Sequence, residues 1–362
     1  MADFRRKTRQ IQVGNVRIGG DAPISVQSMT NTDPLDFEAT SAQISALCAA
    51  GCDIVRLAIP NTAAVRTLAK LKEQFPQTPL VADIHFDYKL ALGALDAGVD
   101  KIRINPGNIG DRERVRAVAD AARRRGVPIR IGVNSGSLES HILEKYGAPT
   151  PMALAESALY HAELLEACDF HDIAISVKAS TVRAMIEANR ILAEKTDYPL
   201  HLGVTEAGGA HTGSIKSAIG IGALLSEGIG DTIRVSLTAD PVLEVKEGRA
   251  ILSALDLLEE KQIDIVSCPT CGRTKIDLIP LLSEFEAELD RHSLRSVPIK
   301  VAFMGCIVNG PGEAREADIG VAGGDGIGVI FRRGVPMEKV KMDEIVPTLI
   351  KEICIMKEKK HD

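Results

Sequence analysis

The stretch Lys101-Ile-Arg-Ile-Asn105 carries the pattern that decides the fold. It is a short run of apolar, β-branched residues broken by polar side chains, and a helix-like stretch, Arg112–Arg125, follows it. Leu80-Val-Ala-Asp-Ile84 before it and Pro128-Ile-Arg-Ile-Gly-Val133 after it are similar in length and apolar content. Apolar runs of this length are typical of buried strands, and their alternation with helices indicates parallel βα units.

The same alternation covers about residues 24–240. The other strand candidates are Pro23–Met29, Ile54–Ile59, Ile173–Lys178, Leu200–Thr205 and Thr232–Leu237. The other helix-like stretches include Ala39–Ala50, Ala63–Gln74, Ala155–Cys168, Thr181–Thr196 and Ser214–Ser226. Eight apolar strands with helices between them predict a (β/α)8 TIM barrel. A doubly wound open sheet is the alternative, but no Gly-x-Gly-x-x-Gly follows the first strand.

Ahead of the barrel, the sequence predicts a short hairpin. Two short stretches, Gln10–Val13 and Val16–Ile18, flank a Gly-Asn pair, which favours a tight turn. We expect this hairpin to cover the lower end of the barrel.

After the eighth strand the pattern changes. A helix is expected from Pro241 to about Glu259, and a small α+β segment follows it. Within that segment, Gly323-Gly324-Asp325-Gly326 precedes a strand rather than a helix, which favours a hairpin turn over a phosphate-binding loop. We therefore expect a barrel domain, with its hairpin, over residues 1–259 and a small α+β domain over residues 260–362.

The composition indicates a globular protein of the cytoplasm. Of the 362 residues, 45% are hydrophobic and 25% are charged, and the net charge is −6. The sequence has no run of about 18 apolar residues that would predict a membrane span, and its charged start lacks the apolar segment of a signal peptide. Seven cysteines fit a reducing compartment and a metal site better than a disulfide scaffold. The acidic charge and the absence of Trp argue against nucleic acid as a partner.

Charged and polar side chains stand where the predicted strands end. In a barrel these positions face the catalytic mouth. The residues in question are Arg56, Asp83, His85, Arg103, Arg130, Asn134, Lys178, Glu206 and Ser236. Converging cations are unfavourable unless an anion compensates them, and guanidinium groups match phosphate oxygens. We therefore expect a small substrate with more than one phosphate, and we expect Glu206 to be the acid/base group.

Simpler interpretations of these residues stay open at this point. A single Arg or Lys at a strand end could form a surface ion pair, and His85 could be a packed histidine. Lys178 could instead form a Schiff base with a carbonyl substrate.

Three cysteines near the C-terminal end form an incomplete metal site. They occur in Cys268-Pro-Thr-Cys271 and in Met304-Gly-Cys306-Ile-Val-Asn-Gly-Pro-Gly-Glu313. A Cys-x2-Cys pair serves zinc and iron–sulfur centres equally. Structural zinc usually takes four Cys or His ligands, and no His lies near Cys306 in the sequence. The spacing therefore favours an iron–sulfur centre, with Glu313 as the nearest candidate for a labile fourth ligand.

Several motifs resemble those of one enzyme family. These motifs are Gln27-Ser-Met-Thr-Asn-Thr-Asp33, Ala82-Asp-Ile-His-Phe86, Arg103-Ile-Asn-Pro-Gly107, Gly132-Val-Asn-Ser-Gly-Ser-Leu138, Thr205-Glu-Ala-Gly208 and the stretch from Met304 to Glu313. Over nearly its whole length, the chain resembles the 4-hydroxy-3-methylbut-2-enyl diphosphate synthase family of the methylerythritol phosphate pathway, in its compact bacterial form.

The resemblance implies a site and a reaction. It implies a [4Fe-4S] cluster in the small domain, held by Cys268, Cys271, Cys306 and Glu313. The implied binding residues for the cyclic diphosphate substrate are Arg56, Arg103, Arg130, Asn134, Lys178 and Ser236, with Glu206 as the catalytic acid. The implied reaction opens 2-C-methyl-D-erythritol 2,4-cyclodiphosphate and removes a hydroxyl group, with two electrons from reduced flavodoxin or ferredoxin.

Chain connectivity predicts an assembly. A helix of roughly 18 residues after the eighth strand would carry the chain some ~27 Å away from the mouth of its own barrel. No Gly/Ser/Pro-rich linker follows near residue 260. We therefore expect a head-to-tail homodimer, in which each cluster domain caps the partner's barrel and the active site lies across two chains; the resemblance implies the same.

Two other functions remain possible at this stage. One is a barrel aldolase that uses a Lys178 Schiff base and carries a structural zinc domain. The other is a zinc-dependent binding module on a barrel scaffold.

Overall fold

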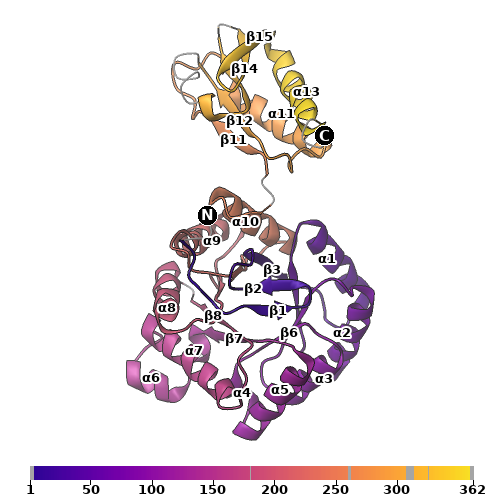
Figure 1. Ribbon diagram of the computed structural model, residues 1–362, viewed down its shortest axis with the longest axis vertical. Helices are drawn as coiled ribbons and strands as arrows, with labels where there is room; N and C mark the ends of the chain where they lie inside the picture. The colour runs from indigo at the N-terminus through magenta and orange to yellow at the C-terminus, as the bar shows by residue number, and fades with distance from the viewer. Residues whose placement is uncertain (1–3, 180, 260–261, 307–313, 325, 359–362) are drawn as a thin grey trace. The chain divides into compact units, whose positions relative to one another are not determined.

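The computed structural model describes residues 4–179, 181–259, 262–306, 314–324 and 326–358 of the chain (Figure 1). Contacts divide the chain into two compact units, Met1–Leu258 and Glu259–Asp362. Each unit is described here by itself.

The first unit is a parallel barrel. Its sheet has eight strands in the order β8-β7-β6-β5-β4-β3-β10-β9. These strands are β3 Ser25–Met29, β4 Ile54–Ala58, β5 Leu80–Asp83, β6 Lys101–Ile104, β7 Ile129–Asn134, β8 Ile173–Lys178, β9 His201–Leu202 and β10 Thr232–Ile233. A bridge between Ile175 and Leu200 joins β8 to the chain entering β9, and the Ile175 amide donates to the Pro199 carbonyl at 2.9 Å. This bridge closes the circle, and the predicted TIM barrel is confirmed.

Helices surround the barrel and alternate with its strands (Figure 1). They are α1 Phe37–Ala49, α2 Thr62–Gln74, α3 Tyr88–Asp96, α4 Pro106–Ile109, α5 Arg112–Arg125, α6 Ser140–Tyr146, α7 Pro151–Glu166, α8 Val182–Lys195, α9 Ala210–Ser226 and α10 Pro241–Ala254. Several begin at a residue whose side chain caps the backbone, such as Asp36 for α1 and Asn61 for α2. These caps satisfy amide groups that the first helical turn leaves unpaired.

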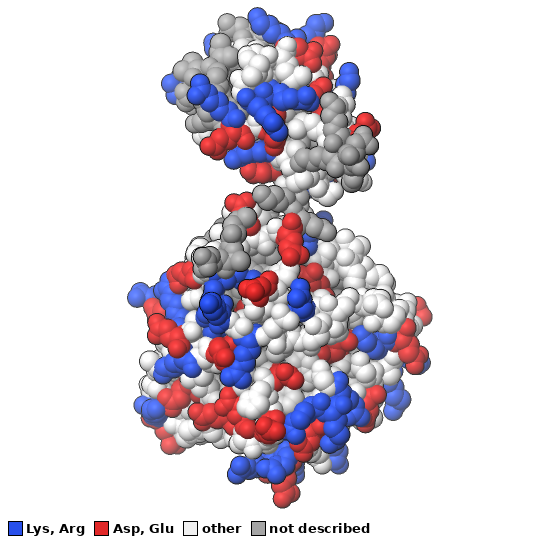
Figure 2. Space-filling model, viewed as in Figure 1, with Lys and Arg blue, Asp and Glu red and all other residues white. Residues whose placement is uncertain are grey.

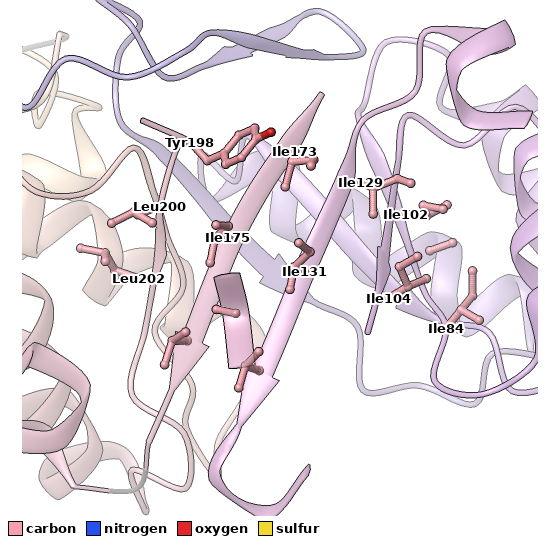
Figure 3. Packing of buried hydrophobic residues seen from close by; sticks show 14 of the residues in the cluster. Ile84, Ile102, Ile104, Ile129, Ile131, Ile173, Ile175, Tyr198, Leu200 and Leu202 are labelled. Carbon is pink, nitrogen blue, oxygen red and sulfur yellow. The ribbon is translucent and has the colours of Figure 1, made fainter. Parts of the chain in front are cut away.

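The residues of the barrel strands alternate between two faces. Ile102 and Ile104 of β6, like Ile129 and Ile131 of β7, pack in the large core between the strands and the helices (Figure 3). The residues between them, such as Arg103 and Arg130, lie on the opposite face and point into the barrel. The strands therefore bury apolar side chains outward and carry polar side chains inward.

A small hairpin closes the lower end of the barrel. Strands β1 Ile11–Val13 and β2 Val16–Ile18 pair antiparallel. Their side chains Ile11, Val13 and Ile18 form an apolar cluster with Ile54, Val81 and Ala174, which lie near the amino ends of β4, β5 and β8. The predicted hairpin and its position are confirmed.

Three predicted boundaries were wrong. The last two barrel strands are shorter than Leu200–Thr205 and Thr232–Leu237, because regular pairing between them ends at Leu202 and Ile233, and Gly203 offers no side chain to pack. The following helix ends at Ala254 rather than near Glu259, since Asp256 adopts a left-handed backbone conformation with φ 55°.

The second unit contains a five-stranded sheet and two long helices. The sheet order is β11-β12-β13-β14-β15, with the first three strands parallel and the last two added antiparallel. Its elements are β11 Asp264–Ser267, α11 Leu278–Arg291, β12 Lys300–Met304, β13 Ile319–Gly323, β14 Ile327–Arg332, β15 Val335–Lys341 and α13 Ile345–Glu358. Gly323 of β13 pairs with Gly328 of β14, which confirms the hairpin turn between these strands.

Within the residues that the structure describes, no helix is both long enough and apolar enough to cross a membrane.

Candidate active site and cysteine edge

The inside of the barrel holds a group of cationic side chains. Arg56, Arg103, Arg130 and Lys178 come from β4, β6, β7 and β8, and none is more than 9% exposed. The simpler interpretation of these residues as surface ion pairs is therefore wrong. A fifth cation, Arg234, follows β10. We call Arg56, Arg103, Arg130, Lys178 and Arg234 together the cation cluster.

Asp83 is the carboxylate that organises one side of this cluster. Its Oδ2 accepts a hydrogen bond from Arg56 Nη2 at 2.5 Å, and its Oδ1 accepts one from Arg103 Nη1 at 3.3 Å. Burial alone would raise the pKa of Asp83, but Arg56, the hydrogen bond with His85 and Arg103 hold that pKa well below its ordinary value. Asp83 therefore stays ionised and fixes the two guanidinium groups.

Among the residues that the structure describes, neither Arg130 nor Lys178 forms an ion pair with a carboxylate. Nε and Nη1 of Arg130 have no hydrogen-bond acceptor among the described residues. Burial lowers the pKa of Arg130 well below its ordinary value, and the charges of Arg56 and Arg103 add to this effect. Burial likewise lowers the pKa of Lys178, and Arg234 and Arg130 lower it further. These groups are arranged as they would be for an anion that is not a protein side chain.

Two glycines make room for the cations. A Cβ atom on Gly132 would lie 2.2 Å from Nε of Arg103, whose Nη2 donates to the Gly132 carbonyl at 2.9 Å. A Cβ atom on Gly203 would lie 2.8 Å from Nζ of Lys178. A larger side chain at either position would push a cation from its place.

Arg234 was missed by sequence reasoning. Its Nε and Nη2 each lie 3.4 Å from Glu244 Oε2, and its Nη1 lies 3.7 Å from Met29 Sδ. Glu244, on α10, also accepts hydrogen bonds from Ser28 Oγ at 2.9 Å and from the Leu237 amide at 3.0 Å. The signal was present, because Arg234 precedes Ser236 by two residues and therefore shares its face of the strand.

The remaining predicted residues lie toward the carboxyl ends of the strands. Asn134 ends β7 and is paired in register with Lys178, and Ser236 is half-buried beyond β10. His85 is 57% exposed and lies 3.2 Å from Asp83 Oδ2, so the packed-histidine interpretation is wrong. Glu206 is exposed and has a left-handed φ of 53°, which is uncommon for a residue other than glycine.

The backbone around Glu206 is held in place on both sides. The Thr205 amide donates to the Ala179 carbonyl at 3.3 Å, and the Thr238 amide donates to the Gly208 carbonyl at 3.0 Å. These bonds join the segments that follow β8, β9 and β10. Glu206 is therefore presented at the mouth by a braced turn.

A buried histidine braces two other segments near the mouth. His161, fully buried on α7, lies with Nε2 2.5 Å from Glu139 Oε1, and its Nδ1 accepts a hydrogen bond from the Gly107 amide at 3.2 Å. Ser157 donates to the other Glu139 oxygen at 2.7 Å. Burial opposes ionisation of Glu139, but the hydrogen bonds from His161 and Ser157 lower its pKa to about 2. This pairing holds together the segments that follow β6 and β7.

The second unit brings the cysteines to one edge of its sheet. Cys268 follows β11 and Cys306 follows β12, and these strands are parallel neighbours with Ser267 opposite Phe303. The Cys268 amide donates to the Phe303 carbonyl at 3.0 Å, and Cys268 Sγ accepts from the Gly305 amide at 3.3 Å. We call the loops that carry Cys268, Cys271 and Cys306 the cysteine edge.

Cys271 lies in a short turn of the same edge. Its amide donates to Thr274 Oγ1 at 3.0 Å, and the next residue along, Lys275, donates its amide to the Gly305 carbonyl at 2.8 Å. A hydrogen bond from the Arg273 backbone, with further contributions from its side chain, lowers the pKa of Cys271. The turn is thereby tied to the residue before Cys306.

The donors at this edge suit a soft metal centre. All three cysteines are free thiols, and thiolates are the ligands of iron–sulfur and zinc centres. Among the described residues, no three His, Cys, Asp or Glu side chains are arranged to hold a metal ion. Glu313, the fourth expected ligand, lies in 307–313, outside the described residues. The three thiols suit the expected cluster in their chemistry, and the loops that carry them lie at the same edge of the sheet.

Comparison with known proteins covers both units. The chain matches the family described as "GcpE TIM-barrel domain" over residues 8–249 and the one described as "GcpE protein C-terminal domain" over residues 264–354. Among solved structures, the spore coat polysaccharide biosynthesis protein of Bacillus subtilis has a TM-score of 0.50 and 13% identity, covering 68% of this chain and 73% of that chain. That likeness supports the barrel fold alone.

Two curated relatives span nearly the full length. A protein of Clostridium perfringens is 58% identical over 349 residues, which cover 96% of this chain and 99% of that protein. A protein of Caldanaerobacter subterraneus is 57% identical over 353 residues, which cover 98% of both chains. Both are named 4-hydroxy-3-methylbut-2-en-1-yl diphosphate synthase (flavodoxin). The chain therefore belongs to the GcpE family, whose curated members are 4-hydroxy-3-methylbut-2-en-1-yl diphosphate synthases.

Proposed function

We propose that this chain converts 2-C-methyl-D-erythritol 2,4-cyclodiphosphate into (E)-4-hydroxy-3-methylbut-2-enyl diphosphate and water, using two electrons. The observation that carries the proposal is the buried cation cluster, in a chain more than half identical to relatives named for the diphosphate product. The relatives' name supports this reaction and gives no support to the Lys178 aldolase.

The cation cluster would bind the diphosphate. Arg56 and Arg103 are already oriented by Asp83, so their remaining N–H groups need little reorganisation to meet phosphate oxygens. Arg130 offers two N–H donors that have no partner among the described residues. Burial lowers the pKa of Lys178, and an adjacent anion would stabilise the charged form of both side chains. Asn134 and Ser236 would add neutral hydrogen bonds at the mouth.

Two further side chains would complete the substrate site. Asp83 would act through Arg56 and Arg103, as a positioning residue rather than a phosphate ligand. His85, beside Asp83 and well exposed, would reach substrate at the mouth.

Glu206 would supply a proton to the departing hydroxyl group. It is exposed, and backbone hydrogen bonds hold its turn on both sides. The other carboxylate among the predicted strand-end residues, Asp83, is engaged by Arg56 and Arg103. Its left-handed backbone conformation is the kind of local strain that functional sites retain. We expect Glu206→Gln to lower kcat by roughly 10²–10⁴ with a small change in KM, whereas the exposed control Glu194→Gln should match the parent.

Cys268, Cys271 and Cys306, with Glu313, would hold the [4Fe-4S] cluster in the α+β domain. Such a cluster supplies low-potential electrons one at a time, which side chains cannot do. The relatives' name specifies flavodoxin, and we propose flavodoxin rather than ferredoxin as the donor. All seven cysteines are free, which supports a reducing, cytoplasmic location.

We also propose the head-to-tail homodimer, on the basis of the path of α10 within the barrel unit. Glu244, near its start, contacts Ser28 toward the carboxyl end of β3. Arg249 Nη1, farther along, lies 3.4 Å from the carbonyl of Gly51, shortly before β4 begins. The 14 residues of α10 extend roughly 21 Å. The chain thus leaves the barrel at the end away from the mouth, as a cluster that serves a partner's barrel requires.

The direct test of the reaction is anaerobic turnover. Full-length protein, reconstituted with iron and sulfide, is mixed with the cyclodiphosphate and reduced flavodoxin, and the linear diphosphate is measured by mass spectrometry. Product at many turnovers per chain is expected. Protein that contains its iron and sulfide yet forms no product would overturn the proposed function.

The assembly has its own test. Cys306→Ser and Glu206→Ala proteins are each inactive alone in this proposal, and mixing them should restore part of the activity in heterodimers. Lack of restoration, with subunit exchange shown by mass-tagged chains, would refute an active site across two chains.

A further inference from the structure

Below the cation cluster, the barrel contains a second set of buried polar side chains. These are Ser25 and Gln27 of β3, Lys101 of β6, His201 of β9 and Thr232 of β10, which we call the floor residues. None is more than 4% exposed, and Lys101, His201 and Thr232 are completely buried. Each has at least one side-chain nitrogen or oxygen without a hydrogen-bond partner among the described residues.

The floor residues face the inside of the barrel from strands on several sides of it. Thr232 is paired in register with His201 on one side and with Ser25 on the other. Lys101 precedes Arg103 by two residues and so lies on the same inward face, one step nearer the hairpin. Arg130 is paired in register with Arg103 on the neighbouring strand, so it too lies on the inward face close to the level of Lys101.

The apolar hairpin cluster lies beneath this space. Ile54 precedes Arg56 by two residues on the same inward face, and it packs with Val13 and Ile18 of the hairpin. The floor residues therefore lie between an apolar base and the cation cluster. None of the floor residues is among the predicted diphosphate ligands. Arg130, which is one of those ligands, lies next to the floor residues.

The balance of donors and acceptors at the floor favours an anion over water. Lysine and arginine side chains donate only, and the amide of Gln27 and the hydroxyls of Ser25 and Thr232 can donate as well. The acceptors without partners are few: the Gln27 carbonyl, one nitrogen of His201 and the hydroxyl oxygens. A water molecule would bring as many donors as acceptor sites, whereas an anion only accepts.

The charge balance points the same way. Two buried carboxylates contact the cations, and both are engaged: Asp83 with Arg56 and Arg103, and Glu244 with Arg234. Among the residues that the structure describes, neither carboxylate forms a hydrogen bond with a floor residue. On the outside of the barrel unit, in contrast, acidic and basic side chains are mixed over the face in view (Figure 2).

We propose that the floor residues, together with Arg130, form a second anion site that holds one small monovalent inorganic anion of the size of chloride. This site is distinct from the diphosphate ligands above it and does not depend on the proposed reaction. Burial and the charges of Arg130 and Arg56 lower the pKa of Lys101, and an anion here offsets that effect. The anion thus fixes Arg130 from below while its other face stays free for substrate.

Bromide locates the site directly. Crystals of the full-length, cluster-containing protein are grown with bromide as the only small anion, with and without the cyclodiphosphate, and bromine is located by anomalous scattering. A peak within hydrogen-bond distance of Lys101 Nζ and Arg130 is expected in both crystals. Floor density that carries no anomalous signal, or a peak that substrate displaces, would overturn the proposal.

Thermal unfolding tests the site in solution. Chloride should raise the Tm of the full-length protein relative to gluconate at equal ionic strength, because a ligand that binds only the folded state stabilises it. In Lys101→Met, which removes a buried donor while keeping an apolar chain, this chloride-specific shift should vanish. The exposed control Lys70→Met should keep the full shift.

The outcomes separate the two proposals. An equal chloride shift in Lys101→Met and Lys70→Met would refute the floor site, whatever the enzyme turns over. Should Lys101→Met fail to fold, the bromide peak in the unaltered protein decides alone. A floor anion in a protein that forms no diphosphate product would leave the site intact and overturn only the reaction.

Discussion

The inside of the barrel and the cysteine edge hold their functional groups in different ways. In the barrel, Arg56, Arg103, Arg130 and Lys178 stand on strands, and the strand register fixes where each one lies. At the cysteine edge, the thiols stand on loops that follow β11 and β12, and short backbone hydrogen bonds hold those loops. An anion site can thus be complete before its ligand arrives, whereas a cluster site relies on its metal to organise the last ligands.

The difference also concerns stability. Buried cations without partners cost folding free energy, which an anion offsets. Free thiols at a sheet edge carry no comparable penalty, since Cys271 is exposed and Cys306 is half-buried. We therefore expect substitutions in the barrel to change substrate affinity and, where they unpair or remove a buried charge, the free energy of unfolding. Substitutions at the cysteine edge should change iron content and turnover but neither of these quantities.

The largest effect is expected for Cys306→Ser. Loss of a thiolate ligand should abolish turnover and lower the iron content, because the remaining donors cannot hold the full cluster. Calorimetric affinity for the cyclodiphosphate should stay within about threefold of the parent if the barrel binds it independently. Cys354→Ser, on α13 of the same unit, is the matched control and should keep its iron. A large loss of substrate affinity in Cys306→Ser would show that the barrel does not bind the cyclodiphosphate independently of the cysteine edge.

Next in size is Asp83→Asn. This change leaves Arg56 and Arg103 buried without their carboxylate, and breaking such a buried pair costs about 3–5 kcal/mol. The pKa of Asp83 is lowered in the folded state, so its stabilising effect is present above its unfolded pKa of about 3.9 and is lost as the pH falls below that value.

Chemical denaturation from pH 7 to pH 3 checks this prediction. The free energy of unfolding of the parent barrel should fall steeply below about pH 4. That of Asp83→Asn should be low at every pH and should depend less on pH in the acid range. The exposed control Asp21→Asn should follow the parent. Equal stability of Asp83→Asn and parent at pH 7 would show that the cation cluster does not need this carboxylate.

Arg130→Met should separate binding from stability. Removing a charged donor from a buried site is expected to weaken cyclodiphosphate binding by about 2–5 kcal/mol. The unfolding free energy should stay equal or rise by about 1–4 kcal/mol, because an apolar chain replaces a buried charge. Calorimetry and denaturation measure the two effects, with the exposed Arg124→Met as control. A variant that is destabilised while it keeps its affinity would reverse the assignment.

The smallest effect is expected in the uptake of protons by Lys178 when the diphosphate binds. The pKa of Lys178 is lowered in the free protein by burial, Arg234 and Arg130, and a bound diphosphate should raise it again. Binding should therefore take up protons over the pH range in which the free Lys178 ammonium group loses its proton, and affinity should fall as the pH rises through that range. Calorimetry in buffers of different ionisation enthalpy measures the uptake, which Lys178→Met should lose and Lys70→Met should keep. Proton release on binding would contradict this account.

The sequence predicted the barrel because its signals are local. The period-2 runs around Arg103 and Arg130 and the helix caps depend on neighbours in the chain, so the fold class, the hairpin and most elements could be predicted. The last two strands were too long in the prediction, since regular pairing ends at Leu202 and Ile233, and the apolar residues Val204 and Val235 beyond those points continue the strand-like sequence pattern.

Site residues were predictable where they stood at strand ends. Lys101, His201 and Arg234 were missed because they lie farther inside the strands, before Arg103, Glu206 and Ser236, although the same alternation places them inward. The Glu139–His161 pair joins residues from α7 and a loop, and no local pattern announces such a pair. The burial that lowers the pKa values of Arg130 and Lys178 likewise depends on the closed barrel and not on their neighbours in sequence.

The apolar hairpin at the base of the barrel has a kinetic consequence. Ile11, Val13 and Ile18 pack against the amino ends of three strands at that end, so we expect solvent and solutes to reach the floor residues from the side of the cation cluster. A bound substrate would then block this route, and an ion at the floor residues would leave only after the product has left. The order of loading would be fixed as well: the small ion enters first, and the organic molecule follows.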